Sequence, residues 1–357
     1  MTLGLAVSSA DQLRARRLPG WAAPGIAAAA LGLAWLLVEP TGAGGPVLTG
    51  AVAAGLFTAG LVVAAHRVEG KRAARDRLAT TLICGAFLLA LAPLASVAIM
   101  LVVKGSQLLN ADFLTHSMRN IGPRDPGGGA YHAIIGTLEQ AGIATLITVP
   151  LGIAAAIFIV EYGRGPLAHA IRFFVDVMTG VPSIVAGLFI LAFWVKLVTP
   201  LYSPDHRPHY SGFAAALALS VLMLPTVVRS TEEMLRLVPA ALREGAYALG
   251  IAKWRTIVRI VLPTAGPGIV TGVMLAVARA CGETAPVLLV AGGNPAINVD
   301  PFADNQSSLS LYVFEQAGKA QANAPGRAWA AALTLVVLVL ALTVGAKLLA
   351  RRNTLAR

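Results

Sequence analysis

Long apolar runs are the feature that most limits what this sequence can fold into. Several runs exceed the roughly 20 residues that an α-helix needs to cross the hydrocarbon core of a bilayer. Apolar types make up 57% of the 357 residues, and charged types make up only 13%. That charged fraction is about half of what an ordinary soluble domain carries. We therefore predict an all-α, polytopic membrane protein.

The apolar runs predict about eight transmembrane helices. The first run follows a basic stretch but lacks an Ala-x-Ala cleavage site, so we interpret it as a retained helix and not as a signal peptide. The first two runs are rich in Ala, Gly and Leu, and the basic linker 66–77 separates them from the others. The predicted spans are residues 21–38, 46–65, 78–103, 133–160, 173–198, 213–231, 263–291 and 328–350.

This order of spans predicts three parts. Residues 1–77 are expected to form a helical hairpin extension with its basic linker, residues 78–350 a six-helix transmembrane core, and residues 351–357 a tail. The long connections at 104–132 and 292–327 are rich in Pro, Gly and Asn, so we expect irregular surface segments there.

The net charge of +11 is explained better by a membrane than by nucleic acid. Cytoplasmic loops of membrane proteins carry an excess of Lys and Arg. If the N-terminus is cytoplasmic, most basic runs fall on inner segments, and the opposite orientation inverts that bias. We therefore predict that both termini are cytoplasmic, with membrane lipid and not nucleic acid around the chain.

Metal and redox chemistry have no support in the sequence. Cys84 and Cys281 lie inside apolar spans, and we expect both to be small packing residues. The sequence contains no CxxC pair and no His-x-x-x-His spacing, so no metal site is predicted. We also expect this chain to bind no cofactor.

The longest inner connection, 232–262, contains a polar, helix-prone stretch in a chain that is otherwise apolar. The stretch "REGAYALGIAKWRTIVRIVLP" predicts two short helices that are bent at Gly250, because glycine disfavours a helix interior. Pro263 is expected to begin the next span. From composition alone, the stretch fits an amphipathic helix on anionic lipid as well as it fits a docking element. The apolar side chains expected on one face are Ala246, Leu249, Trp254 and Ile257.

The spacing within this stretch favours the docking element. Glu244-Gly245-Ala246, then Gly250, then Ile260 and Leu262-Pro263 resemble the "EAA…G…I-LP" loop of bacterial ABC importer permeases. In that family the loop is a coupling helix that inserts into a cleft of the cytoplasmic ATPase. Gly245 stands where the family has alanine, and glycine lowers helix propensity by about 1 kcal/mol. The resemblance implies an ATPase-coupling role for Glu244, Gly245, Ala246 and Gly250.

Other stretches narrow the family. Residues 127–162, 179–191, 224–239 and 277–289 are similar to the PstA-type permeases of phosphate importers, and the resemblance covers about 78–350. It implies a type I ABC importer permease that passes inorganic phosphate across a bacterial plasma membrane into the cytoplasm. It also implies a PstC-like second permease, two PstB-like ATPases and a PstS-like binding protein outside. The sequence contains no G-x-x-x-x-G-K-[ST] loop, so ATP is expected to be hydrolysed by the partner subunits.

Arg279 is the first candidate for contact with an anion. It lies near the middle of the predicted span 263–291, where a charged side chain costs roughly 2.5–3.5 kcal/mol and usually faces a bundle interior or a pathway. Glu283 is one helical turn further on the same face. The pair fits an ion pair that only fixes helix packing, and it also fits an oxyanion site, because Arg presents a fork of donors.

Arg229, near the inner end of the sixth predicted span, is the second candidate. Glu232 and Glu233 are spaced to pair with it along one helix. From the residues alone, an interfacial anchor is the simpler interpretation of Arg229. The family resemblance implies instead that arginines at Arg229 and Arg279 take part in phosphate passage. Two other acids near inner helix ends are expected to be solvated, namely Glu161 and Asp176.

Other functions stay open from the residues alone. A permease for another oxyanion, such as sulfate or molybdate, could use the same two arginines. A membrane-embedded enzyme needs a nucleophile, a base or metal ligands that converge at membrane depth, and the sequence shows no such set. A pore does not need a coupling loop.

Overall fold

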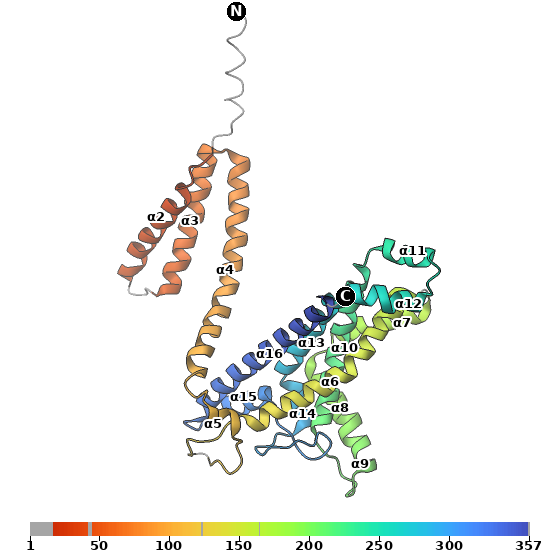
Figure 1. The fold of residues 1–357 in the computed structure, drawn as a ribbon. Coiled ribbons are helices and arrows are strands. Elements are labelled where there is room, and N and C mark those ends of the chain that lie inside the picture. Colours follow the sequence, from red (N-terminus) through yellow and green to blue (C-terminus); the bar gives the residue numbers. More distant parts are fainter. Residues whose placement is uncertain (1–16, 42–44, 123, 164, 356–357) are drawn as a thin grey trace, which may run out of the picture. The chain divides into compact units, whose positions relative to one another are not determined.

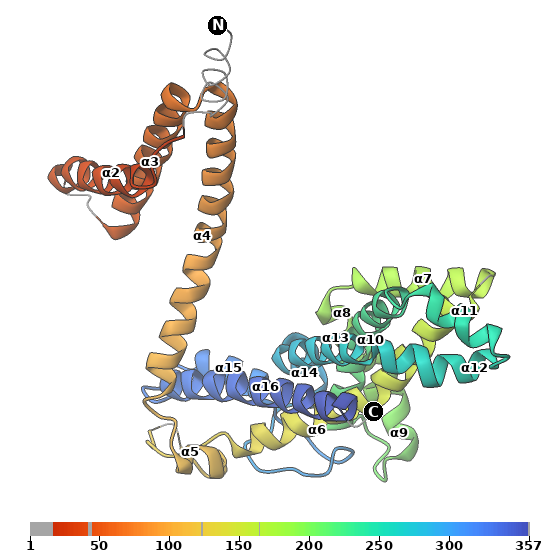
Figure 2. The same ribbon diagram turned by 45° about the horizontal axis from the view of Figure 1, so that its top comes forward.

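Helices form all the named elements of the computed structural model (Figure 1), which confirms the predicted all-α class. Figure 2 shows the same helices from a second direction. The chain divides into two compact units, Met1–Ile99 and Met100–Arg357, and each is described by itself below. The structure describes residues 17–41, 45–122, 124–163 and 165–355.

The first unit contains the predicted hairpin. Helices α2 (Ala22–Val38) and α3 (Pro46–Val68) pack against each other, and small side chains such as Ala34 and Ala65 are fully buried. Helix α4 (Lys71–Gly105) begins directly after Gly70, so the last residues of the predicted linker are helical. The division of the chain at residue 77 stays a prediction, because α4 runs through that point.

Seven helices in the described part of the chain are long and apolar enough to cross a membrane. The remaining predicted span corresponds to α2, an apolar helix of 17 residues that is shorter than the others. The count of eight spans is therefore not confirmed, although apolar helices occupy all eight predicted regions.

The second unit holds the remaining helices, and several of them run on through wider π-helical turns, labelled η2 to η4. In chain order the elements are α5 (Ala111–Thr115), α6 (Tyr131–Ile157), η2 (Phe158–Tyr162), α7 (Pro166–Thr179), α8 (Ser183–Ile190), η3 (Leu191–Val198), α9 (Thr199–Tyr202), α10 (Gly212–Arg236), α11 (Ala240–Ala248), α12 (Lys253–Thr256), η4 (Ile257–Val261), α13 (Leu262–Gly282), α14 (Ala285–Ala291), α15 (Leu309–Ala317) and α16 (Ala324–Leu355).

Two predicted spans are broken. The span predicted at 173–198 consists of α7, α8 and η3. Helices α7 and α8 are separated at residues 180–182, because proline cannot donate a backbone hydrogen bond and disfavours a helical residue before it. The span predicted at 263–291 consists of α13 and α14, which are separated where Glu283 adopts an extended backbone.

Pro263 lies in the first turn of α13, as expected, but helical structure already precedes it. Helical structure is continuous over Lys253–Gly282, through α12, η4 and α13. The π-helical turn at Ile257–Val261 directly precedes α13, and proline at its first turn lacks the backbone donor that an α-helical ladder requires. The helix that contains this span therefore starts about ten residues earlier than the sequence pattern indicated.

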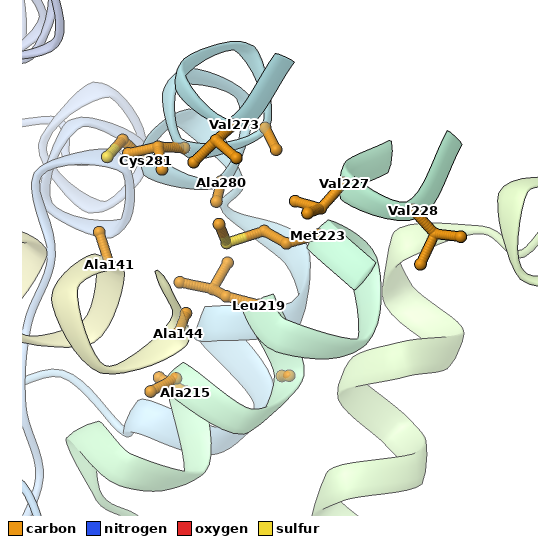
Figure 3. Close-up of a cluster of buried hydrophobic side chains, with 14 of the residues drawn as sticks. Ala141, Ala144, Ala215, Leu219, Met223, Val227, Val228, Val273, Ala280 and Cys281 are labelled. Carbon is orange, nitrogen blue, oxygen red and sulfur yellow. The ribbon is translucent and has the colours of Figure 1, made fainter. Parts of the chain in front are cut away.

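The core of the second unit forms where α6, α10 and α13 meet (Figure 3). Most of its side chains are small, so the helix axes approach closely, as is typical of helix interfaces in membranes. Cys281 packs in this core as expected, whereas Cys84 is exposed on α4. The core residues in view are Ala141 and Ala144 of α6, Ala215, Leu219, Met223 and Val227 of α10, and Val273, Ala280 and Cys281 of α13.

Two glycines of α6 are needed at contacts. A Cβ atom at Gly152 would lie 2.7 Å from Cγ1 of Val227 on α10, and one at Gly136 would overlap the backbone oxygen of Ser307. Any larger side chain at either position must push α6 away from its neighbours, since well-packed interiors have no spare volume.

Gly136→Ala is expected to lower the thermal stability of the purified protein. The added methyl group overlaps a backbone oxygen that cannot rotate away, and such overpacking costs about 1–3 kcal/mol. Gly142→Ala is the matched control, because it lies on the same helix and its methyl group would meet nothing within 4 Å. Thermal unfolding in detergent checks the difference. Equal stability of the two variants would contradict the close approach of α6.

Candidate functional site

Arg229 belongs to a cluster of five charged side chains on α7 and α10. The guanidinium of Arg229 pairs with Asp176 and lies 3.4 Å from Oε2 of Glu232. The other carboxylate oxygen of Glu232 lies 2.6 Å from Nη2 of Arg236 and 3.3 Å from Nη2 of Arg172. Three arginines against two carboxylates leave one excess positive charge. The Glu232 side chain is only 4% exposed, so it needs these partners to offset its desolvation.

The predicted partners of Arg229 are therefore partly corrected. Glu232 pairs with Arg229, whereas the Glu233 side chain is exposed and does not belong to the cluster. Asp176 was expected to be solvated, but it forms an ion pair with Arg229 although its side chain is half exposed. The sequence could not show this pairing, because the two residues lie on different helices.

Arg279 lies in the last turn of α13, and not near the middle of a span as expected, because that helix starts early and stops at Gly282. Its side chain is 63% exposed, and its Nε atom lies 3.5 Å from Oε1 of Glu283. The pair is therefore confirmed, but Glu283 follows the end of the helix. The hydroxyl of Ser310 donates to the Glu283 carbonyl at 2.9 Å, which holds this helix end in place.

The two arginines occupy different levels of the α10–α13 helix pair. Gly272 of α13 lies against Ser230, the neighbour of Arg229, as a Cβ atom there would overlap the Ser230 side chain. Arg279 follows two helical turns further along α13, a rise of roughly 10 Å. The structure therefore does not join Arg229 and Arg279 into one site. It arranges them in succession along the helix pair.

A buried polar network between α6 and residues 306–310 was missed by the sequence analysis. The Gln306 amide donates to Oε2 of Glu139 at 2.5 Å, and the Gln140 amide donates to Oε1 of Gln306 at 3.0 Å. Residues 306–310 lie in the connection 292–327, which was expected to be a surface segment, yet they are buried. The signal that could have revealed it is the pair of glycines, Gly136 and Gly212, whose missing side chains admit this segment.

The predicted bend at Gly250 is confirmed. Gly250 has φ of +74°, in the left-handed region that favours glycine. Its N–H donates to the Tyr247 carbonyl at 2.9 Å, and the Ile251 N–H donates to the Ala246 carbonyl at 3.1 Å. This pair of bonds is the Schellman motif that ends a helix. It explains why glycine stands at this fixed distance after the Glu244-Gly245-Ala246 triplet.

Arg243 anchors helix α11 to η2, the π-helical turn that follows α6. Its guanidinium donates twice to Oε1 of Glu161, at 3.0 and 2.8 Å, and also to the carbonyls of Val238 and Leu235. The ammonium of Lys253 donates to the Glu161 carbonyl. Glu161 was expected to be solvated, but its side chain is 6% exposed. This single residue therefore ties both short helices of the connection to the membrane domain.

The connection leaves an apolar surface uncovered. Of the four side chains expected on its apolar face, Ala246 and Ile257 are buried, whereas Leu249 is 81% exposed and Trp254 is also exposed. Glu244 and Gly245 are exposed on the same helix as Ala246. Ala246 and Ile257 pack the two short helices against the rest of the unit, whereas Leu249 and Trp254 are available to a partner protein. Among the described residues, no group of three or more His, Cys, Asp and Glu side chains could hold a metal ion.

Comparison with known proteins defines the class. The family described as "Binding-protein-dependent transport system inner membrane component" matches residues 148–355, more than half of the chain. A solved structure of a bacterial alginate ABC transporter, in complex with an alginate pentasaccharide-bound periplasmic protein, is similar with a TM-score of 0.54. The identity is 18%, and the match covers 78% of this chain and 96% of that one, so the likeness concerns the fold alone. The class is a membrane component of an ABC importer.

Curated relatives narrow the class further. The phosphate transport system permease protein PstA of Mycobacterium leprae is 46% identical over 76% of this chain and 87% of its own length. PstA 1 of Mycobacterium tuberculosis (strain H37Rv) is 44% identical over 78% of this chain and 88% of its own length. PstA of Xylella fastidiosa (strain Temecula1) is 36% identical over 81% and 97%. The chain belongs to this family of inner-membrane transport components, in its PstA-type branch.

Glu161→Gln is expected to loosen the anchored connection. The substitution keeps the side-chain shape but removes the charge that holds the Arg243 guanidinium, and hydrogen bonds to charged groups contribute about 1.5–3 kcal/mol. Hydrogen–deuterium exchange of residues 240–250 should become faster. Glu233→Gln removes an equal charge from an exposed residue nearby and should leave that exchange unchanged. The anchor is refuted if both variants exchange like the parent protein.

Proposed function

We propose that this chain is the permease subunit that moves inorganic phosphate inward in a bacterial ABC importer. The observation that carries the proposal is the 44–46% identity to permeases named PstA, over 76–78% of the chain. The fold of an ABC importer permease supports it. The excess of Lys and Arg on the connections assigned to the inside supports a plasma-membrane location with both termini in the cytoplasm.

The uncovered connection supports partner ATPases that hydrolyse the ATP. Its bend at Gly250 and its exposed Leu249 and Trp254 form a knob that is held rigidly to α6 by Glu161. A rigid knob transmits a displacement of an ATPase to the membrane helices. One such knob serves one ATPase, so we infer a PstC-like second permease, two PstB-like ATPases and a PstS-like binding protein outside.

The two arginine levels support passage of a phosphate ion along the α10–α13 pair. A phosphate that leaves water needs strong donors, and an Arg fork supplies charge-assisted hydrogen bonds. The ion must also leave, so its binding cannot be too tight. Each arginine already has a competing carboxylate, Glu283 at Arg279 and the pair Asp176 and Glu232 at Arg229. Competition of this kind keeps each site weak enough to release the ion.

Uptake of labelled phosphate by the complete complex in proteoliposomes tests the substrate. We expect unlabelled phosphate and arsenate to compete, because both are tetrahedral anions that retain a protonated oxygen near neutral pH. Sulfate and molybdate should compete weakly. Inhibition by sulfate or molybdate as strong as that by phosphate would replace phosphate with another oxyanion.

Arg279→Gln is expected to abolish phosphate uptake while the subunit still assembles, because the side chain is exposed and its loss leaves no core cavity. Arg279→Lys should restore little, since lysine lacks the planar fork. Glu283→Gln should reduce uptake less than loss of the arginine. Uptake is compared with co-purification of the partner permease and ATPase. Near-normal uptake by an assembled Arg279→Gln complex would make Arg279 a packing residue.

Gly250→Ala is expected to uncouple ATP hydrolysis from transport. An alanine in the left-handed region costs about 1–2 kcal/mol, so the Schellman motif is strained and the knob shifts. Gly245→Ala is the matched control, because a methyl group there meets nothing within 4 Å and alanine favours the helix by about 1 kcal/mol. Phosphate moved per ATP hydrolysed should fall in the first variant only. An equal ratio in both variants would argue against a coupling role.

A further inference from the structure

A polar cavity of about 360 Å³ lies in the second unit beside α15 and the start of α6. The charged groups of the two arginine sites do not line it, so the cavity is separate from the proposed phosphate route. Residues 118, 120, 121 and 293–295 complete its wall. The side chains that matter for its chemistry are His132, Tyr312, Glu315, Gln316 and Lys319.

Three buried polar atoms of the cavity lining have no hydrogen-bond partner in the described part of the chain. They are Nδ1 of His132, the hydroxyl of Tyr312 and Oε1 of Gln316, and each residue is at most 3% exposed. The rings of His132 and Tyr312 meet edge to face at 5.2 Å, which fixes both beside the cavity. Native proteins pair nearly all buried polar atoms. The three atoms therefore indicate an occupant that supplies hydrogen bonds.

The side chains that line the cavity favour an occupant that donates hydrogen bonds. The orphaned Oε1 of Gln316 can only accept, and an ionised Glu315 can only accept. The Glu315 side chain makes no hydrogen bond or ion pair with any described residue. Burial raises the pKa of Glu315, and the charge of Lys319 partly offsets this. Lys319 also lines the cavity, but its side chain is exposed, whereas Glu315 is partly buried. The charge that an occupant meets inside the cavity is therefore the Glu315 carboxylate, and water supplies donors but no charge to balance it. A basic group supplies both.

The cavity faces the outer side in the orientation that the charge distribution predicts, because the connections 104–132 and 292–327 surround it. We propose that it receives a lysine or arginine side chain of the extracytoplasmic phosphate-binding protein when that protein docks. Glu315 is the counter-charge, and Gln316 and Tyr312 complete the hydrogen bonds. The inference rests on the proposed function, since that function requires such a protein.

Docking measured on the assembled complex in nanodiscs tests this cavity. The cognate binding protein should bind the Glu315→Lys complex roughly tenfold or more weakly than the parent complex. Lys319→Glu adds an acid at the rim and should tighten binding. Asp112→Lys is the matched control, because Asp112 is an exposed acid in the same outer region that does not line the cavity. Its effect should be small.

Unchanged docking by the Glu315→Lys complex overturns the inference, and so does an equal loss with Asp112→Lys. Saturable binding of free guanidinium that leaves docking unaffected also overturns it, because the cavity would then hold a small solute. Phosphate uptake by the parent complex separates this inference from the proposed function. Absent uptake removes the proposed function, whereas normal uptake with unchanged docking of Glu315→Lys removes only the cavity.

Discussion

Close contact between α6 and α10 is the constraint on which the rest of the second unit depends. Lipid tails are as apolar as leucine, so helices in a membrane associate through packing and hydrogen bonds, and not by leaving water. Glycine at 152 and alanines such as Ala144 and Ala215 let these two helices touch. Because α6 is held there, its end carries Glu161 to the inner connection, and its start places Gln140 against residues 306–310.

Charged groups inside this packed frame show how a membrane protein tolerates them. Glu232 and Glu161 are almost fully buried. Glu232 pairs with Arg229 and Arg236 of its own helix and with Arg172 of α7, and Glu161 pairs with Arg243 of α11. Removing a buried partner leaves an uncompensated charge, which costs far more than the pair contributes. The Arg229 cluster, to which Glu232 belongs, keeps one excess positive charge, and its Asp176 is half exposed. An excess positive charge of this kind favours the approach of an anion.

Local signals in the sequence predicted the local features of the structure. Apolar runs gave the helices, the i, i+3 spacing gave the Arg229–Glu232 pair, and glycine gave the bend at residue 250. The contacts that were missed required knowledge of distant partners. Arg243 lies 82 residues from Glu161 in sequence, and Gln306 is buried because glycines elsewhere make room for it. The helix ends at 180–182 and 283 were missed although Gly, Pro and Glu mark them in the sequence, because the apolar runs on either side were joined into one span.

The exposed Leu249 and Trp254 affect the stability of the subunit in the cell before it assembles with its partners. A large apolar surface in water is a target for chaperones, proteases and self-association, and this one lies on the connection assigned to the cytoplasm. A molecule synthesised in excess of its partners therefore keeps an adhesive surface that correctly assembled molecules hide. Chaperones and proteases can therefore recognise unassembled subunits by this exposed surface alone. The abundance of the complex then follows the scarcest subunit, and not the total amount of this chain.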